Sequence, residues 1–450
     1  MTEVAADATG VIAEHAVKLD LAAVPAEVVR MARSVCTDTI GVLYSASREA
    51  AVQTALRAFP LGDGPCTVVG HSGGASPTRA AFVNGVGGHD IELDDVHTSS
   101  RTHPACVIVP AALAAAEAAG DTPGAELLAG IVAGYDVEVR LSKAMGVQQQ
   151  FDRGFHPSGV CGSIGAAAAA GRILNLSVDQ MRACIALGAA QSSGLLTFEE
   201  DPSHMLKSFN TGVAARNGVY AALLAQRGFR GAPDVLTGRH SVLTPYSRPD
   251  PEPAKLLEGL GEHYEICFTS IKRHACCSQT HSAIDALLIL QEQHGIAAPD
   301  ISGIDVRLAH GAVAMIDGNP LWTHNIQYVL AVAAREGRIG REHFGAGWTG
   351  NPEILGLAAR VRLSGSDELQ TRFPGSQGAI VTITTGSGTH TLQRDIPAGS
   401  PDQPLSDTEL RTKFDGLVGP VLAAQARADL WKALSSLERQ QSIRGLLAPS

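Results

Sequence analysis

Aromatic side chains are scarce in this sequence of 450 residues: Phe, Trp and Tyr make up 4% of it, although hydrophobic residues make up 45%. That hydrophobic share is normal for a globular protein with a large core. Because alanine and glycine are abundant, we expect helices that pack closely through small side chains. A long apolar run is also missing. The longest, residues 106–119, contains Pro110 and Glu117 and is too short to cross a bilayer, so we expect no membrane contact.

Positive charge is in deficit as well, because the formal net charge is −10. A surface potential of that sign gives no general attraction for nucleic acid or for acidic membranes. We therefore expect no nucleic-acid partner. An anionic substrate would need a local group of Lys, Arg and His side chains that overcomes the overall field.

The eight cysteines form no compact framework of the kind that staples secreted domains. Most fall in apolar helical stretches, where a free thiol behaves as a small core side chain. The first residues, 1–7, lack the basic and apolar regions of a signal peptide. Together these features predict a reducing, cytoplasmic setting.

The first 265 residues are predicted to be all-helical, because strand-like alternation is scarce there. Between Pro25 and Ser45 the apolar residues fall on one helical stripe, and Pro25 suits a first-turn position. Further helices are expected at 53–59, 78–88, 110–119, 124–134, 165–174, 178–191 and 213–226.

The pattern changes after Glu265. Residues 302–308 alternate as a half-buried strand does, and 378–385 with 389–395 indicate a hairpin around Gly386. Helices at 280–293 and 326–336 lie between them. A linker rich in Pro, Ser and Asp follows at 397–406, and helices then return. We therefore predict an all-helical domain of residues 1–265, rejoined by 400–450, and an α+β domain of residues 266–399.

The segment from His89 to His103 is the richest in groups that can move a proton. It holds four carboxylates, three histidines and Arg101. Crowded carboxylates repel one another, which raises some pKa values and suits a general acid or base. A solvated acidic turn is the alternative, and the histidines count against it. A calcium loop of the EF-hand type is excluded, because Asp95 replaces the required Gly and Arg101 takes the last ligand position.

A second segment combines His156 with a run of small residues, 157–170. His156 precedes Pro157 at the expected start of a helix, where free N–H groups suit a carboxylate. No strand precedes the segment and its glycines lack the G-x-G-x-x-G spacing, so it is not a dinucleotide loop. His156 is therefore either an anion-binding residue or a cap of its own loop.

Two further segments place cations near helix starts. Lys207 stands at the end that the helix dipole disfavours for a cation, which favours an anion-holding role over a surface role. Lys272 precedes Cys277, His281 and Asp285, which fall at i, i+4 and i+8. Adjacent cysteines without a second pair argue against zinc, and three suitably spaced cysteines for an iron–sulfur cluster are missing. We therefore predict no metal.

In this order and spacing, the four segments resemble the MmgE/PrpD family over most of the chain. Each segment alone is a modest signal, whereas four in register are a strong one. The resemblance rests on Glu92-Leu-Asp-Asp, His103-Pro104 and Pro110-Ala-Ala-Leu; on Gly154-Phe-His156-Pro157 and Cys161-Gly; on Lys207 and Gly212-Val-Ala-Ala; and on Lys272, Cys276-Cys277, His281 and Ile284-Asp285-Ala.

The resemblance implies a mainly α fold with an α+β lid, a homodimer, and an active site in the cleft between the helical domain and the lid. Members of the family dehydrate 2-methylcitrate, decarboxylate cis-aconitate or epimerise iminodisuccinate. None of these reactions needs a metal or an organic cofactor, so the resemblance implies none here.

By motif, the resemblance assigns five catalytic positions. Glu92 stands where the family has a shorter aspartate, and Cys277 stands where the decarboxylases have a further histidine. Both departures count against a simple transfer of the decarboxylase activity. The catalytic positions are Glu92, His103, His156, Lys207 and Lys272. The substrate-binding candidates are Arg101, Thr98, Cys277, Tyr328 and His97.

All three reactions build negative charge next to a carboxylate, so fixed cations and hydrogen-bond donors are their main requirement. We expect Lys207 and Lys272 to hold substrate carboxylates, and His103 or Glu92 to move the proton. The leading hypothesis is a lyase, either a dehydratase or a decarboxylase, acting on a small di- or tricarboxylic acid. The alternative is an epimerase or isomerase. A non-enzymatic anion-binding protein is a third possibility, but it has no reason to place acids in its pocket.

Overall fold

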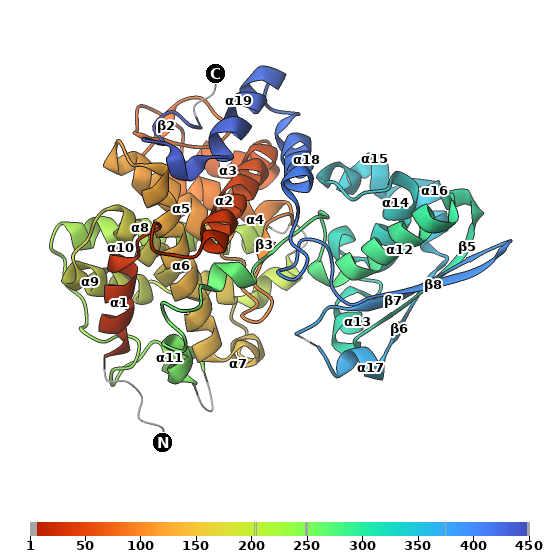
Figure 1. The fold of residues 1–450 in the computed structure, drawn as a ribbon, viewed down its shortest axis with the longest axis horizontal. Helices are drawn as coiled ribbons and strands as arrows, with labels where there is room; N and C mark the ends of the chain where they lie inside the picture. The colour runs from red at the N-terminus through yellow and green to blue at the C-terminus, as the bar shows by residue number, and fades with distance from the viewer. Residues whose placement is uncertain (1–6, 202, 204, 248–250, 374, 448–450) are drawn as a thin grey trace. The chain divides into compact units, whose positions relative to one another are not determined.

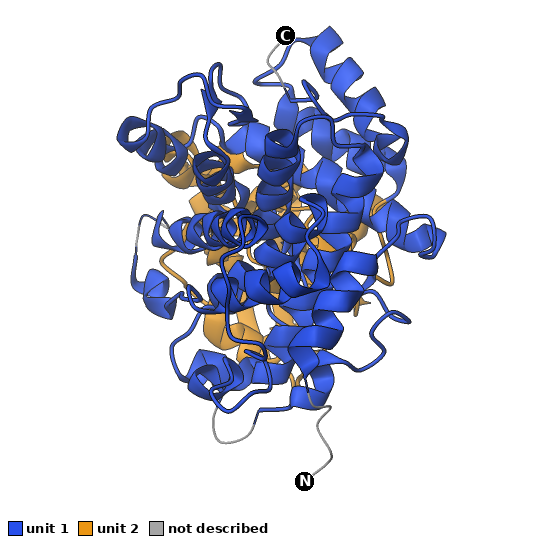
Figure 2. Ribbon diagram, turned by 90° about the vertical axis from the view of Figure 1, so that its left-hand side faces the viewer, with its two compact units in different colours: residues 1–90, 94–269, 406–450 blue, residues 91–93, 270–405 orange. Residues whose placement is uncertain are grey.

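The computed structural model describes residues 7–201, 203, 205–247, 251–373 and 375–447 (Figure 1). The chain divides into two compact units, which Figure 2 shows in different colours. Unit 1 comprises residues 1–90, 94–269 and 406–450, and unit 2 comprises residues 91–93 and 270–405. Unit 1 is helical and contains both chain ends, whereas unit 2 carries a four-stranded sheet, so the fold is mainly α with a smaller α+β part, as predicted.

Unit 1 is built from helices, with short strands at three places. Figure 1 shows α5, α6 and α8 side by side, and α10 packs against α4 and α8. Its helices are α1 (Ala8–Lys18), α2 (Ala26–Ala46), α3 (Ala50–Ala58), α4 (Pro77–Asp90), α5 (Ala105–Ala119), α6 (Gly124–Met145), α7 (Val147–Asp152), α8 (Pro157–Ile173), α9 (Val178–Ala189), α10 (Met205–Gln226), α11 (Leu243–Tyr246), α18 (Asp407–Val418) and α19 (Ala424–Leu434). Its strands are β1 (Cys66–Thr67), β2 (Gly74–Ala75) and β3 (Asp95–Val96).

Small residues set the distances between the central helices of unit 1, as the composition predicts. A Cβ placed on Gly85 of α4 would lie 2.9 Å from the Cα of Gly212 in α10. A Cβ on Gly218 of α10 would lie 2.3 Å from the Cβ of Ala166 in α8. Helix axes approach this closely only where side chains are absent or small. The backbones of α4, α8 and α10 are therefore in near-direct contact.

Four central helices are longer than the apolar pattern predicts, since α8 and α10 begin before residues 165 and 213 and α5 and α6 are also extended. Helix α5 begins at Ala105 and contains Pro110, because the carboxylate of Asp95 accepts the N–H of Ala105 and fixes an earlier start. Helix α6 continues to Met145 although charged residues interrupt the apolar pattern in its second half. These charged residues are buried inside the protein. Among them, Arg140 donates to three backbone carbonyls of residues 258–263. Buried polar groups with partners of this kind break the hydrophobic period without ending a helix.

Unit 2 contains a four-stranded sheet in the order β6-β5-β7-β8. Strand β5 runs parallel to β6 and antiparallel to β7, and β7 with β8 forms the predicted hairpin. Helix α12 packs on β7 and β8, and α14 packs on α12. The strands are β4 (Ser270–Ile271), β5 (Ile301–Leu308), β6 (Val361–Gly365), β7 (Ala379–Thr385) and β8 (Gly388–Arg394). The helices are α12 (His281–His294), α13 (His310–Ile316), α14 (Ile326–Glu336), α15 (Ala346–Thr349), α16 (Pro352–Ala358) and α17 (Asp367–Gln370).

The predicted absence of a membrane-spanning segment agrees with the helices that the structure describes. None of them combines the length and the apolar composition that a bilayer crossing requires.

Candidate active site

The segment between α4 and α5 is held in place by polar contacts to the neighbouring helices. The N–H of His103 donates to the hydroxyl of Ser158 in the first turn of α8, at 2.9 Å. The Asp95 carboxylate accepts from the first turn of α5 and from the hydroxyl of Tyr135 in α6, at 3.0 and 2.7 Å. Arg101 lies in the left-handed region, with φ 50°. A non-glycine residue in that region is a sign of a constrained loop.

Two imidazoles share one carboxylate oxygen at the centre of this segment. The Nδ1 atoms of His89 and His103 lie 2.7 and 2.8 Å from Oδ2 of Asp94. The Nδ1 of His103 also lies 2.7 Å from the carbonyl oxygen of Asp95. Because both neighbours of this nitrogen are acceptors, it carries the proton, and the Nε2 of neutral His103 is the basic nitrogen.

His156 and Lys207 belong to the same cluster. His156 precedes α8, as predicted, and its ring stacks on that of His89 with centroids 5.9 Å apart and an interplanar angle of 11°. Asn210 of α10 places its side-chain nitrogen 3.5 Å from Nδ1 of His156. Lys207 is the third residue of α10 and is buried.

Burial keeps two of the three rings neutral. It lowers the pKa of His89 to about 4, with the charge of Lys207 acting in the same direction and Asp94 acting against it. Burial also lowers the pKa of His156 well below its ordinary value, assisted by the charge of Lys207. The ring of His103 is the most exposed of the three, with 17% of its side chain accessible. The cluster therefore combines one accessible imidazole, two neutral imidazoles, a carboxylate and a buried ammonium group.

Two further buried carboxyl groups, those of Asp95 and Glu138, belong to unit 1. Burial raises the pKa of Asp95 to about 8, although its hydrogen bond with Tyr135 opposes the rise. Burial and the nearby charge of Asp95 raise the pKa of Glu138, in α6, well above its ordinary value. Neither carboxylate oxygen of Glu138 has a hydrogen-bond partner in the described part of the chain. Both side chains are therefore neutral acids near pH 7.

Unit 2 brings together the other two predicted catalytic residues. The ammonium group of Lys272, just after β4, lies 3.2 Å from Oε2 of Glu92, and both side chains are buried. Glu92 adopts a φ of 55°, so its backbone is also held in the left-handed region. A buried ion pair of this kind costs desolvation and is weak evidence for stability alone.

The histidine and cysteine residues that follow Lys272 form a network of their own. His274 lies 3.2 Å from the carboxylate of Asp285, which also accepts the N–H of Ala398 at 2.7 Å. Helix α12 begins at His281, so Cys277 precedes the helix and does not share its face as predicted. The thiol of Cys277 is buried, and its N–H donates to the carbonyl of Thr323.

The remaining predicted substrate-binding residues contact side chains other than those of the His103 cluster. His97 is one example. His97 is fully buried, with its Nδ1 2.9 Å from the Ser100 hydroxyl and its Nε2 3.5 Å from Glu265. Burial raises the pKa of Glu265, but hydrogen bonds with His97 and Lys143 outweigh that effect and lower it to about 2. His97 therefore joins its loop to a charged network in unit 1 and contacts different residues from His103.

Arg101, Thr98 and Tyr328 complete the predicted set. The guanidinium of Arg101 lies 5.1 Å from the ring centre of Phe151, and burial lowers the Arg101 pKa. Thr98 is half-buried in the same loop and accepts the N–H of Arg101 through its carbonyl. Tyr328, in unit 2, is buried and its hydroxyl donates 2.5 Å to the carbonyl of His343.

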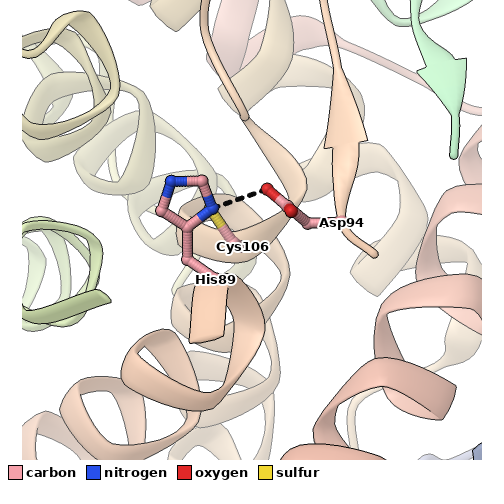
Figure 3. Close-up of side chains that lie close together, drawn as sticks. All are labelled: His89, Asp94 and Cys106. Atoms are coloured by element: carbon pink, nitrogen blue, oxygen red, sulfur yellow. Dashed lines mark hydrogen bonds and ion pairs between the residues drawn. The ribbon is translucent and has the colours of Figure 1, made fainter. Parts of the chain in front are cut away.

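His89, Asp94 and Cys106 are close enough to be tested as a metal site. Their potential ligand atoms lie within 4.8 Å of one another, and Figure 3 shows the imidazole of His89 directed at the carboxylate of Asp94. That carboxylate oxygen already accepts from His89 and lies 2.8 Å from Nδ1 of His103, and the thiol of Cys106 donates to the carbonyl of His103. Burial raises the pKa of Cys106 well above its ordinary value, so the sulfur is not the thiolate that binds metals. The donor set fits a proton-sharing cluster better than a metal centre.

The residues that sequence reasoning did not select are the partners of those it did. His89 and Asp94 lie within the segment from His89 to His103. They are five residues apart on either side of the end of α4, and this spacing corresponds to no sequence motif. Tyr135 and Glu138 lie inside α6, far from that segment in sequence, and only the packing of α6 places them near Asp95.

Comparison with known proteins identifies one family. The MmgE/PrpD N-terminal domain matches residues 10–254, and the MmgE/PrpD C-terminal domain matches residues 274–439. A cis-aconitate decarboxylase-like protein of Aspergillus oryzae is 26% identical over 94% of this chain and 93% of its own length. The cis-aconitate decarboxylase of Aspergillus terreus is 24% identical over 94% and 92%, and a mitochondrial 2-methylcitrate dehydratase of Yarrowia lipolytica is 24% identical over 66% and 62%. Because both domains of one family match along the chain, this protein belongs to the MmgE/PrpD family of lyase-type enzymes, as its motifs predict.

Proposed function

We propose that this protein is a lyase, a dehydratase or a decarboxylase, for a small di- or tricarboxylic acid of the 2-methylcitrate or cis-aconitate type. The observation that carries the proposal is the cluster of unit 1, in which the accessible imidazole of His103 is bound to Asp94 beside a buried Lys207. Relatives that align over most of the chain are named as cis-aconitate decarboxylases, which supports the same reaction class.

His103 is the proposed acid–base group. Its Nε2 takes a proton from the carbon next to a carboxylate, or returns one, while Nδ1–H stays hydrogen-bonded to the Asp95 carbonyl, 2.8 Å from Oδ2 of Asp94. The negative charge of Asp94 stabilises the imidazolium that forms. Lys207 supplies a fixed positive charge for the negative charge that builds on the substrate carboxylate, and the neutral rings of His89 and His156 do not repel His103 when it is charged.

Lys272 is proposed to hold a second carboxylate group, with Glu92 as its anionic partner when no substrate is bound. The 3.2 Å ion pair supports an exchange in which a substrate carboxylate replaces or joins Glu92 at the ammonium group. The matched control for Lys272 is Lys255, which pairs with a carboxylate at 2.8 Å but is partly exposed.

An epimerase that acts on an iminodisuccinate-like dicarboxylate is the second candidate. It is favoured by Cys277, because a buried thiol cannot supply the charged imidazole that the decarboxylases have at that position. Such an enzyme abstracts and returns one proton and needs no leaving group.

Proton NMR in D₂O separates these functions. We expect cis-aconitate, 2-methylcitrate or a related acid to give a new alkene or alkane signal, with or without released CO₂, at a rate that His103→Asn and Lys207→Met each lower by about 10² or more. Lys255→Met is the control and keeps the parent rate. Deuterium uptake into an otherwise unchanged acid, with loss of optical rotation, would establish the epimerase instead. No reaction of any acid in the panel would refute both.

The proposed assembly is a homodimer that pairs through the outer face of α10. Leu206, Phe209 and Tyr220 are 36%, 47% and 50% exposed on this helix. Side chains at 206, 209, 213, 216 and 220 follow steps of three and four residues, which is the spacing by which two identical helices pack against each other. Arg216 is the one charged member of this stripe, and the others are apolar or aromatic, which suits the self-complementary surface of a two-fold dimer.

Light scattering after size-exclusion chromatography tests this assembly. Phe209→Asp is expected to convert a dimer into a monomer, whereas Leu355→Asp, at an apolar residue of unit 2 that is 39% exposed, leaves the mass unchanged. A monomeric parent protein would refute the proposal.

The proposed compartment is the cytoplasm. All eight cysteines are free thiols in the structure, and seven of them are buried. Thiols persist in reducing compartments, so their number supports this setting.

A further inference from the structure

The two imidazoles beside Asp94 differ in their access to solvent. His103 has an accessible ring, whereas the side chain of His89 has no exposed surface. The Nδ1 of His89 is hydrogen-bonded to Oδ2 of Asp94, and the Nδ1 of His103 lies 2.8 Å from the same oxygen while it is hydrogen-bonded to the carbonyl of Asp95. The ring centroids lie 4.7 Å apart. The same carboxylate oxygen therefore lies beside one ring that is accessible to solvent and one ring that is not.

The ring of His89 is confined to one protonation state. Its Nδ1 donates to Asp94, so its Nε2 is the unprotonated nitrogen. That Nε2 is buried and has no hydrogen-bond partner among the described residues. A proton added there would create an imidazolium without an acceptor on that side, which is why burial holds the pKa of His89 at about 4. His89 is thus a permanent neutral donor over the usual pH range.

We propose that Asp94 and His89 are positioning residues for the acid–base step: Asp94 fixes the tautomer and the charge of His103, and His89 fixes Asp94. This inference rests on the proposed role of His103 as the group that moves the proton. Because burial keeps His89 neutral at neutral pH, His103 is the ring beside Asp94 that takes up the proton. Asp94 therefore stabilises the protonated form of His103 at the step where that form appears.

The hydrogen bond from His89 also keeps Asp94 in one rotamer. Without it, Oδ2 loses a donor at 2.7 Å, and the carboxylate is free to turn away from His103. The Nδ2 atom of an asparagine occupies nearly the same place as the Nδ1 atom of a histidine, so His89→Asn preserves the donor and His89→Leu removes it. These two variants separate the hydrogen bond from the volume of the side chain.

The test measures kcat and KM against pH for the parent protein, Asp94→Asn, His89→Leu and His89→Asn. We expect Asp94→Asn to lower kcat by about 10²-fold. We expect His89→Leu to lower kcat about tenfold with KM changed by less than about threefold, and His89→Asn to restore kcat to within about threefold of the parent. His71→Asn, at a ring whose Nε2 lies 2.9 Å from the carbonyl oxygen of Ser47, is the control.

A second measurement does not depend on turnover. Histidine-selective ¹⁵N NMR of the parent is expected to show Nδ1–H protons on His89 and His103 that are both strongly hydrogen-bonded, and the His103 signal is expected to shift in His89→Leu but not in His71→Asn. An unmoved His103 signal, or full activity of His89→Leu, overturns the positioning role. If the parent acts on no acid while the NMR coupling is present, the proposed function fails and the coupling between the two rings stands.

Discussion

Replacing Asp95 with asparagine tests whether this buried side chain is a neutral acid in the folded protein. Burial raises its pKa from an ordinary value of about 3.9 to about 8. The folded chain therefore binds this proton about 10⁴-fold more tightly than the unfolded chain, which corresponds to roughly 5 kcal/mol at most. Because the folded-state pKa is the higher one, the cost of ionising Asp95 is absent below about pH 4, grows as the pH rises, and is complete above about pH 8.

Asp95→Asn keeps the shape of the side chain and cannot ionise. The free energy of unfolding of the variant, minus that of the parent, is therefore expected to increase from pH 4.5 to pH 8.5 by a few kcal/mol. Urea unfolding followed by helical circular dichroism measures this difference, because most helices belong to unit 1. All groups that titrate equally in both proteins cancel from it. A difference that stays constant, or that turns in favour of the parent as pH rises, would show that Asp95 is ionised and would refute the reasoning.

Glu265→Gln is the matched control of opposite sign. The pKa of Glu265 is lowered to about 2, so its ion pair contributes stability that is present above about pH 4.3 and is lost as the pH falls through about 2. The variant is therefore expected to be less stable than the parent by up to roughly 3 kcal/mol, with a deficit that does not change between pH 5 and pH 8. The two variants together separate a neutral buried acid from an ionised one in the same unit.

Three further substitutions test other parts of the structure. Glu138→Gln is expected to change the free energy of unfolding at pH 7 by less than about 1 kcal/mol, because the native side chain is already neutral; a loss of several kcal/mol by urea unfolding would contradict this. Lys272→Met is expected to lower turnover of the accepted acid by 10²-fold or more while the exposed control Lys255→Met does not, and equal rates would remove Lys272 from the catalytic set. Tyr328→Phe is expected to lower the free energy of unfolding by about 1 kcal/mol through loss of the hydrogen bond to His343, with kcat/KM within about threefold of the parent; a large rise in KM would instead support substrate binding.

Local signals in the sequence were sufficient for elements whose ends carry their own caps. Helix α14 has the predicted bounds, 326–336, because Asn325 caps its first turn and Gly337 ends it in the left-handed conformation. The hairpin of β7 and β8 was predictable from its alternation and its glycine-containing turn. Strand β6 was not predicted, since its five residues pair in parallel with β5, more than fifty residues earlier, and no turn announces that pairing.

The sequence was sufficient to select several residues of the candidate site, but not to identify the residues that they contact. His103, His156 and Lys207 lie in motifs that the sequence displays, and the structure places them in one cluster. The proton on Nδ1 of His103 and the neutrality of His89 follow from burial and from acceptor geometry, which depend on contacts between α4, α6, α8 and α10. Such contacts join residues that no local pattern relates.

The near-contact between the backbones of α4, α8 and α10 limits how this protein can change. One methyl group added at Gly85, Gly212 or Gly218 meets atoms at less than 3.0 Å, so the helices would have to separate. Lys207 stands on the same helix as Gly212 and would move with it. Libraries made to alter substrate choice should therefore leave these three glycines intact and vary the loops, because alanine at any of them would shift the ammonium group of Lys207.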